Sequence, residues 1–126
     1  MKLFDTNIFL EILLTQKRSK KCKKELERSL NQIYISDFSL HSIGVILFKH
    51  DKEKLFKAFL DDILPKVKII TLSKWLYNDL PIIKRKYKLD FDDAYQFKIT
   101  DENGFEIVTM DTDFKKVNDK IKVKFI

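Results

Sequence analysis

Five short β-rich stretches alternate with longer helical stretches along this sequence, and this order constrains the fold more than any other feature. The predicted strands are MKLFD at 1–5, IYIS at 33–36, VKII at 67–70, EIVTM at 106–110 and IKVKFI at 121–126. Strands that alternate with helices are joined by crossovers, which produce a mostly parallel sheet with helices on both faces. The sequence therefore predicts an α/β fold, a three-layer α/β/α sandwich with a mostly parallel sheet of about five strands.

The helical stretches are recognised by apolar residues spaced three and four apart. We predict a first helix capped by Thr6 or Asn7 and a later one that begins at Asp51 and ends at Pro65. The other predicted helices cover 18–30, 38–49, 73–87 and 91–102, the last of them stopped by Asn103-Gly104.

Length and composition indicate one domain over 1–126. The chain has 126 residues, of which 44% are apolar, enough for a single hydrophobic core. Cys22 is the only cysteine, so an intrachain disulfide is excluded and a reduced, cytoplasmic setting is expected. The longest apolar runs fall short of 18 residues, which predicts no membrane span.

Acidic residues lie where several predicted strands end. Asp5 ends the first strand, Asp37 follows the second, and Asp111 and Asp113 follow the fourth, while Asp90, Asp92 and Asp93 begin the helix before the fourth. Acids at helix N-termini also complement the helix dipole, which accounts for Asp51, Asp90 and Asp92. Sites in such sheets form outside the carboxyl ends of the strands, so we expect the other acids to meet there.

Carboxylates that converge raise one another's pKa values unless a cation binds between them. Oxygen ligands alone favour Mg²⁺ or Mn²⁺ over zinc. A water held by such an ion can act as a nucleophile, and this predicts hydrolysis of a phosphodiester.

Three motifs resemble those of the PIN domain: DTN after the first strand, DDA opening a late helix, and VTMDTDF after the following strand. The resemblance extends over essentially the whole chain. It implies Mg²⁺- or Mn²⁺-dependent RNA cleavage, as in the toxin-type, VapC-like ribonucleases of toxin–antitoxin pairs. It also implies a homodimer and inhibition by a partner antitoxin.

The resemblance assigns roles to individual residues. Asp5, Asp93 and Asp111 match the catalytic, metal-binding acids, and Asp113 matches an accessory metal ligand. Thr6 or Thr109 is expected to orient Asp5 or a bound water through its hydroxyl group.

One position departs from the family pattern. The family carries a Glu early in the helix after the second strand, and here that place falls at Ser42 or at His41. Asp37 is one substitute for the missing carboxylate, and His41 is another, as a nitrogen ligand or a phosphate contact. The alternative is an impaired PIN-like module that binds RNA or a protein without cutting.

Basic residues suggest where RNA would bind. The formal charge is +6, which favours polyanionic partners. The densest run is KRSKKCKKE at 17–25, read either as a solvated helix face or as an RNA backbone contact. The residues predicted to rim the acidic site are Lys84, Arg85, Lys86, Lys115 and Lys116.

Aromatic and apolar residues carry further predictions. Phe91, Tyr95 and Phe97 are interpreted as core, with base stacking as the alternative. Trp75 is interpreted as core or dimer interface. The apolar helix segment at 45–48 is interpreted as central or as a homodimer contact.

Overall fold

A five-stranded parallel sheet forms the centre of the computed structural model, which describes residues 1–126. Its strands are β1 (Lys2–Phe4), β2 (Ile33–Ser36), β3 (Lys68–Ile70), β4 (Glu106–Thr109) and β5 (Lys122–Phe125). The strand order is β3-β2-β1-β4-β5, and all neighbouring pairs are parallel. The predicted fold class is therefore confirmed, and each strand lies within its predicted range.

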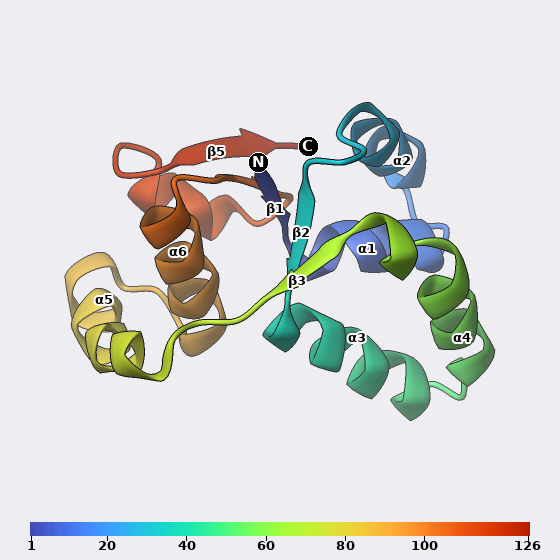
Figure 1. Ribbon diagram of the computed structural model, residues 1–126, viewed down its shortest axis with the longest axis horizontal. Helices are drawn as coiled ribbons and strands as arrows, with labels where there is room; N and C mark the ends of the chain where they lie inside the picture. The colour runs from blue at the N-terminus through green and yellow to red at the C-terminus, as the bar shows by residue number, and fades with distance from the viewer.

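Helices cover both faces of this sheet (Figure 1). The α-helices are α1 (Thr6–Leu13), α2 (Ser19–Arg28), α3 (Asp37–Lys49), α4 (Glu53–Asp62), α5 (Leu80–Tyr87) and α6 (Phe91–Asn103). The 3₁₀ helices are η1 (Leu64–Lys66), η2 (Lys74–Asp79) and η3 (Thr112–Val117). None of these helices combines the length and the apolar character that crossing a membrane would require.

Two hydrophobic clusters lie on opposite sides of the sheet. Side chains alternate along a strand, so Leu3 joins a cluster with α5, α6 and η3, while Phe4 joins one with α1 to α4. Ile107 and Val108 on β4 divide between the two clusters in the same way. Figure 1 shows this division, with α5 and α6 on one side of the strands and α1, α3 and α4 on the other.

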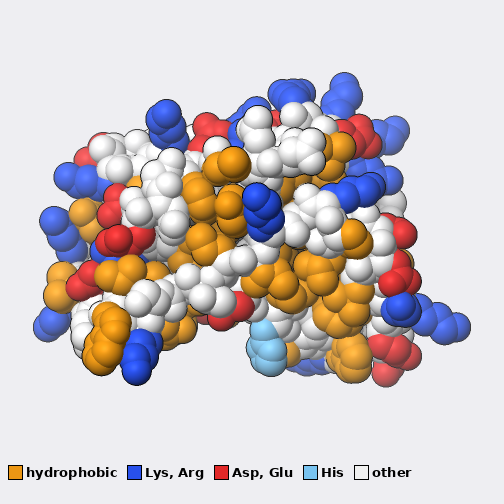
Figure 2. Space-filling view, viewed as in Figure 1, with side chains coloured by type: hydrophobic (Ala, Val, Ile, Leu, Met, Phe, Trp, Pro, Cys, Tyr) orange, Lys and Arg blue, Asp and Glu red, His pale blue; other side chains and the backbone are white.

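Part of α3 remains at the surface. Ile43 and Leu47 are buried under the sheet, whereas Val45 and Phe48 are exposed on the opposite side of the helix. Phe48 packs edge-on against Phe56 of α4. In the space-filling view, hydrophobic side chains gather over α3 and α4 (Figure 2). The interpretation of this helix as wholly central is therefore wrong.

The predicted helix over 73–87 is divided in two. Residues Lys74–Asp79 form η2, and α5 begins only at Leu80. Pro81 explains the break, because proline has no backbone N–H and is accepted only in the first turn of a helix. Trp75 lies in the 3₁₀ part and is 71% exposed, so the core interpretation of Trp75 is wrong. Phe91 is also exposed, at 55%, while Tyr95 and Phe97 are buried as predicted.

Two predicted helix caps are also corrected. Asp5, not Thr6 or Asn7, caps α1, and its Oδ1 accepts a bond of 2.8 Å from the backbone N–H of Thr6. Asp51 adopts a left-handed conformation with φ of 56° and does not cap α4, whose N-cap position is Lys52. The sequence identifies polar residues near a helix start, but the exact cap depends on the residue at which the backbone becomes helical.

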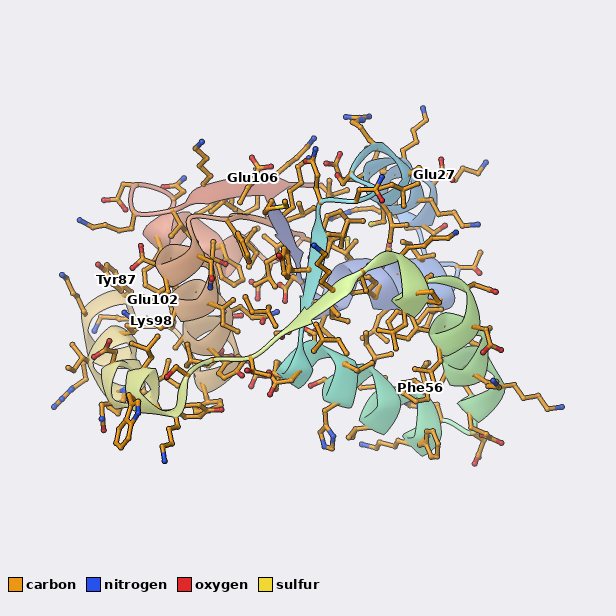
Figure 3. All side chains as sticks on the ribbon, in the orientation of Figure 1. Glu27, Phe56, Tyr87, Lys98, Glu102 and Glu106 are labelled. Carbon is orange, nitrogen blue, oxygen red and sulfur yellow. The ribbon has the colours of Figure 1, made fainter.

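An ion pair joins α6 to η2, the 3₁₀ helix that precedes α5. Lys98 lies 3.0 Å from Asp79 of η2 and 2.9 Å from Glu102 one turn further along α6. Lys98, Glu102 and Tyr87 lie together between α5 and α6 in Figure 3. The position of α6 matters because its first turn carries Asp93.

Candidate metal centre

Neighbouring strands bring the predicted acids to one edge of the sheet. Phe4 of β1 pairs with Val108 of β4, and the N–H of Asp5 donates to the carbonyl of Val108 over 2.9 Å. The chain after each strand therefore leaves the sheet side by side, which brings Asp5 close to Thr109 and Asp111. Asp90 caps α6 at the same edge by accepting from the N–H of Asp93 over 2.9 Å.

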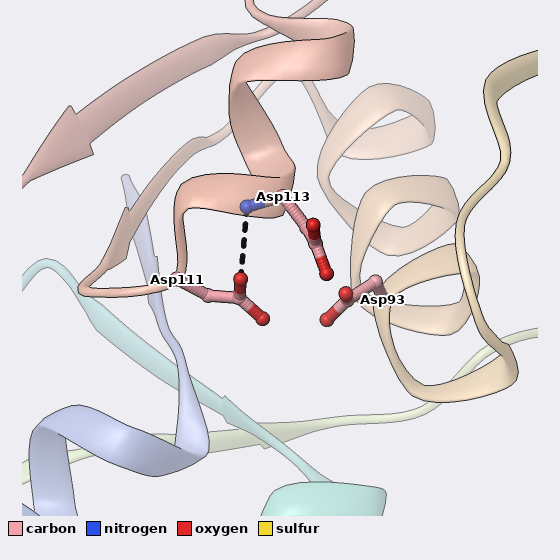
Figure 4. Close-up of side chains that lie close together, drawn as sticks. All are labelled: Asp93, Asp111 and Asp113. Carbon is pink, nitrogen blue, oxygen red and sulfur yellow. Dashed lines mark hydrogen bonds between the residues drawn. The ribbon is translucent and has the colours of Figure 1, made fainter.

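Three carboxylates meet in what we call the Asp cluster: Asp93, Asp111 and Asp113. One oxygen from each lies within 4.8 Å of the others. Figure 4 shows Asp93 reaching from α6 toward the two acids that follow β4. Asp111 is held in place by its own turn, because its Oδ1 accepts from the N–H of Asp113 over 2.9 Å. This bond makes Asp111 the N-cap of η3.

Asp5 lies beside the Asp cluster and is held by hydrogen bonds on both of its oxygens. Oδ1 accepts from the Thr6 N–H and, over 3.2 Å, from the Gln96 amide. Oδ2 accepts from the Thr109 hydroxyl over 2.7 Å and from the Asn7 amide over 3.4 Å. A carboxylate with donors on both oxygens has a fixed orientation.

The two buried acids differ in their electrostatics. Burial raises the pKa of Asp93 to about 8, with further contributions from Asp111, Asp90, Asp5 and Asp113. Burial also raises the pKa of Asp5, although hydrogen bonds from Thr109, Gln96 and Thr6 act in the opposite direction. Asp93 has no such compensation at its Oδ2, which is buried without a hydrogen-bond partner.

The Asp cluster has the donor set of a divalent cation site. Its ligands are all carboxylate oxygens, which suit Mg²⁺ or Mn²⁺ better than zinc. A cation would also satisfy the unpartnered Oδ2 of Asp93, which is otherwise an uncompensated buried acceptor. Lys116 sits at the rim, 3.4 Å from Asp113, which is half exposed. Its ammonium group therefore competes with a cation for Asp113 but not for Asp93.

Helix α3 offers the site a hydroxyl group in place of a carboxylate. Ser39, in its first turn, is fully buried and accepts a bond of 2.7 Å from the Thr6 hydroxyl. His41 is exposed and lines a surface hollow with Val45 and Phe48. Ser42 is partly buried, and no hydrogen bond joins its side chain or that of His41 to an acid.

Asp37 belongs to a different set of contacts. Its Oδ1 accepts from the Tyr95 hydroxyl over 2.6 Å, and Tyr95 in turn accepts from the N–H of Leu72 over 3.1 Å. Tyr95 therefore joins the loop after β3 to α6, and Asp37 joins α3 to Tyr95 and is not part of the Asp cluster.

Basic side chains line hollows on two sides of the acids. Lys84, Arg85 and Lys88 line a hollow with Asp90, the residue that caps α6. Lys17 and Arg18 line a second hollow that includes Asp111. The other predicted residues divide: Lys116 donates to the carbonyl of Lys88 over 3.0 Å, Lys115 is exposed, and Lys86 faces a separate hollow beside Tyr87.

Three residues at the site were not identified from the sequence: Gln96, Ser39 and Asn7. Asn7 both donates to Asp5 and accepts from the Met110 N–H over 3.3 Å, joining α1 to the end of β4. Gln96 lies three residues after Asp93, on the same side of α6. A polar residue at that spacing within a buried helix was the signal present in the sequence.

Comparison with protein-family models gives one match, to the PIN domain over residues 2–120. No curated protein matches the chain.

Solved structures share the fold over most of the chain. A chain of a toxin–antitoxin complex from Klebsiella pneumoniae is 26% identical, with a TM-score of 0.72 and 90% of each chain covered. VapC20 of Mycobacterium tuberculosis, a toxin that cleaves the sarcin–ricin loop, is 15% identical with a TM-score of 0.78, covering 91% of this chain and 93% of that one. A chain of VapBC2 from Rickettsia felis, bound to a promoter DNA fragment, is 19% identical with a TM-score of 0.79, covering 98% and 96%.

Proposed function

The chain belongs to the PIN domain family, and from this premise we propose that it is a metal-dependent endoribonuclease and the toxin of a toxin–antitoxin pair. The proposal is supported by structural neighbours that include a toxin–antitoxin complex and an RNA-cleaving toxin. It places the protein in the cytoplasm, where its RNA substrate is found.

One observation carries this proposal: the Asp cluster with the unpartnered Oδ2 of Asp93. Asp93, Asp111 and Asp113 would hold Mg²⁺ or Mn²⁺, with Asp5 beside them. Such an ion lowers the pKa of a bound water and stabilises negative charge on a phosphate. The protein's own part is to fix the acids: Thr109 and Gln96 orient Asp5, and the N–H of Asp113 orients Asp111.

The direct test is cleavage of RNA by the purified protein. With Mn²⁺ present, we expect a set of structured and unstructured RNAs to be cut at internal positions. EDTA should stop the reaction because it removes the ion that the Asp cluster would hold, and added Mn²⁺ should restore it. Products are read on denaturing gels. RNAs that all remain intact after a long incubation with Mn²⁺ would contradict the proposal.

A second candidate function is an impaired module that binds RNA or a protein without cutting. The observation in its favour is that α3 brings Ser39 to the site and no carboxylate, while Lys116 pairs with Asp113. Metal titration separates the two candidates. The binding module predicts RNA affinity that is the same with and without Mn²⁺.

The two basic hollows define a path for an RNA backbone past the acids. Lys84 and Arg85 lie on the side of Asp90, and Lys17 and Arg18 lie on the side of Asp111. An RNA strand that lies along this path would cross the Asp cluster between the two hollows. Positive charges on both sides compensate phosphates where the acids would otherwise repel them.

Removal of the first hollow's charges should weaken RNA binding in a salt-dependent way. We expect the double substitution Lys84→Ala and Arg85→Ala to reduce the slope of log K against log salt by about 0.7 for each phosphate that these side chains neutralise on a single strand. Binding is measured by fluorescence anisotropy in EDTA, so that cleavage does not interfere. Lys54→Ala on the exposed side of α4 is the control. An equal slope in the double variant and this control would place the RNA elsewhere.

The exposed apolar surface of α3 and α4 is where we place a protein partner. Val45, Phe48 and Phe56 line a hollow there together with His41. Exposed apolar side chains that gather on one face mark protein contacts more often than chance. An antitoxin or a second copy of this chain would cover this surface.

A further inference from the structure

Gln96 is a deeply buried polar side chain beside the acids, and one of its atoms has no hydrogen-bond partner. It is 1% exposed and lies on α6, one turn after Asp93. Its amide nitrogen donates to Oδ1 of Asp5 over 3.2 Å and to Oγ of Ser39 over 2.9 Å. Gln96 therefore links three elements: α6, the start of α1 and the first turn of α3.

These two hydrogen bonds fix the orientation of the amide. Its NH₂ group has two hydrogens, and both are used, one on each acceptor. Turning the amide over would place its oxygen against the Asp5 carboxylate, which has no hydrogen to give when ionised. The oxygen Oε1 is left buried with no hydrogen-bond partner.

The unpartnered oxygen of Gln96 is one of two such atoms. The other is Oδ2 of Asp93, three residues earlier on the same side of α6. Buried acceptors without donors are rare, and a bound ion or water is one explanation for them. Both atoms belong to side chains on the side of α6 that carries Asp93, at the edge of the sheet where the Asp cluster lies.

We propose that Gln96 completes the cation site in place of the acid that α3 lacks: its amide nitrogen holds Asp5 toward the Asp cluster, and its oxygen accepts a hydrogen bond from the hydrated ion. Gln96 is in this sense a positioning residue for a hydrated divalent cation. The inference rests on the proposed function only for the identity of the cation. Mg²⁺ and Mn²⁺ held by a few carboxylates keep several waters, which gives Oε1 a donor.

The neutral charge of the amide has a consequence for the site. A glutamate reaching in from α3 would add a further negative charge to acids that already repel one another, whereas Gln96 and Ser39 add none. The site therefore gains the side-chain oxygen of Gln96 from α6 without further repulsion between negative charges. Oriented hydrogen-bond partners of metal ligands affect metal affinity by about 10–100-fold when they are removed.

The test is a comparison of metal binding and stability in Gln96→Met, which keeps the length of the side chain but has neither amide atom. We expect its dissociation constant for Mn²⁺, measured by isothermal titration calorimetry, to rise about 10-fold or more. Its melting temperature without metal should not fall, because the substitution also removes an unpartnered buried oxygen. The matched control is Thr100→Val, one turn further along α6, whose hydroxyl bonds only to the carbonyl of Gln96.

Thr100→Val is expected to lower the melting temperature and leave the Mn²⁺ affinity within about twofold of wild type. A purely structural role for Gln96 would give Gln96→Met the same result as this control, which would overturn the inference. If Gln96→Met does not fold, Gln96→Asn replaces it: the shorter amide cannot reach both Asp5 and Ser39, so the same loss of affinity is expected.

The outcome is separable from that of the nuclease proposal. Wild-type protein that binds Mn²⁺ but cuts no RNA, with much weaker Mn²⁺ binding in Gln96→Met, would support the role of Gln96 and contradict the nuclease. Wild-type protein that cuts RNA, with unchanged Mn²⁺ affinity in both Gln96 variants, would do the reverse. Wild-type protein that binds no Mn²⁺ would overturn the inference on Gln96.

Discussion

Asp93→Asn is expected to abolish Mn²⁺-dependent RNA cleavage while making the metal-free protein more stable at neutral pH. Loss of a ligand from the Asp cluster removes several kcal/mol of charge stabilisation from the transition state, a rate loss on the order of 10³-fold. The gain in stability follows because Asp93 must take up a proton on folding at neutral pH, whereas asparagine is neutral in both states. Cleavage is measured on denaturing gels and stability by urea unfolding in EDTA.

The predicted effect of Asp93 on stability can also be measured from the pH dependence of the free energy of unfolding. Burial and neighbouring acids raise the pKa of Asp93 to about 8, whereas in the unfolded chain its pKa is near the ordinary value of 3.8. Between these two values the folded protein holds a proton that the unfolded chain has released. The free energy of unfolding contributed by Asp93 therefore falls as pH rises from about 4 to about 8, by up to about 1.4 kcal/mol per pH unit.

Asp93→Asn should remove this fall, and saturating Mn²⁺ should weaken it in wild type, since the ion binds the deprotonated acid. Asp119→Asn is the control, because Asp119 is exposed and outside the site. If the metal-free wild type and Asp93→Asn lose stability in parallel between about pH 4 and pH 8, Asp93 is not the group that titrates.

The sheet and the location of the acids could be predicted from the sequence because both follow from local patterns. Strands such as IYIS are short and apolar, and helical spacing separates them, so a parallel sheet was the consistent arrangement. The rule that sites form at the carboxyl ends of parallel strands then brought Asp111 and Asp113 to the same edge as Asp5. These inferences need only the order of elements along the chain.

The hydrogen bonds at the site could not be predicted because they depend on how helices pack across the sheet. Ser39 and Gln96 are 57 residues apart, and only the docking of α3 against α6 brings them within 2.9 Å. The same limit explains the exposed Trp75 and Phe91, since apolar periodicity predicts a helix face but not whether another element covers it. The absence of a glutamate is visible in the sequence of α3 alone, whereas Gln96, which bonds to α3 at the site, belongs to α6.

Asp5 and Asp93 are both buried acids at the same edge, yet their surroundings differ. Asp5 has donors on both oxygens, and Asp93 has a buried oxygen with none. Substitution by asparagine should therefore have the same effect on cleavage at the two positions and opposite effects on stability. This contrast separates the role of a residue in the reaction from its role in the fold.

Asp5→Asn is expected to abolish cleavage and to make the protein less stable by about 1 kcal/mol, because one side-chain oxygen becomes an NH₂ group that faces existing donors. If the new amide nitrogen takes the place of Oδ1, it meets the Gln96 amide and the Thr6 N–H. If it takes the place of Oδ2, it meets the Asn7 amide and loses the bond that the Thr109 hydroxyl donates. Removal of the carboxyl group offsets part of this loss of stability, because burial disfavours its charged form and raises the pKa of Asp5. The helix cap itself is preserved, because asparagine caps as well as aspartate.

A double-mutant cycle with Thr109→Val identifies the cause of that loss. Valine removes the hydroxyl that donates to Oδ2 of Asp5, so Asp5→Asn then has no Thr109 hydrogen bond left to lose on that side, where only the more distant Asn7 amide donates. The two substitutions should then cost less together than the sum of their separate costs, as expected for residues in direct contact. Additive losses, or an Asp5→Asn protein as stable as Asp93→Asn, would mean that the hydrogen bonds on Asp5 do not hold it in place.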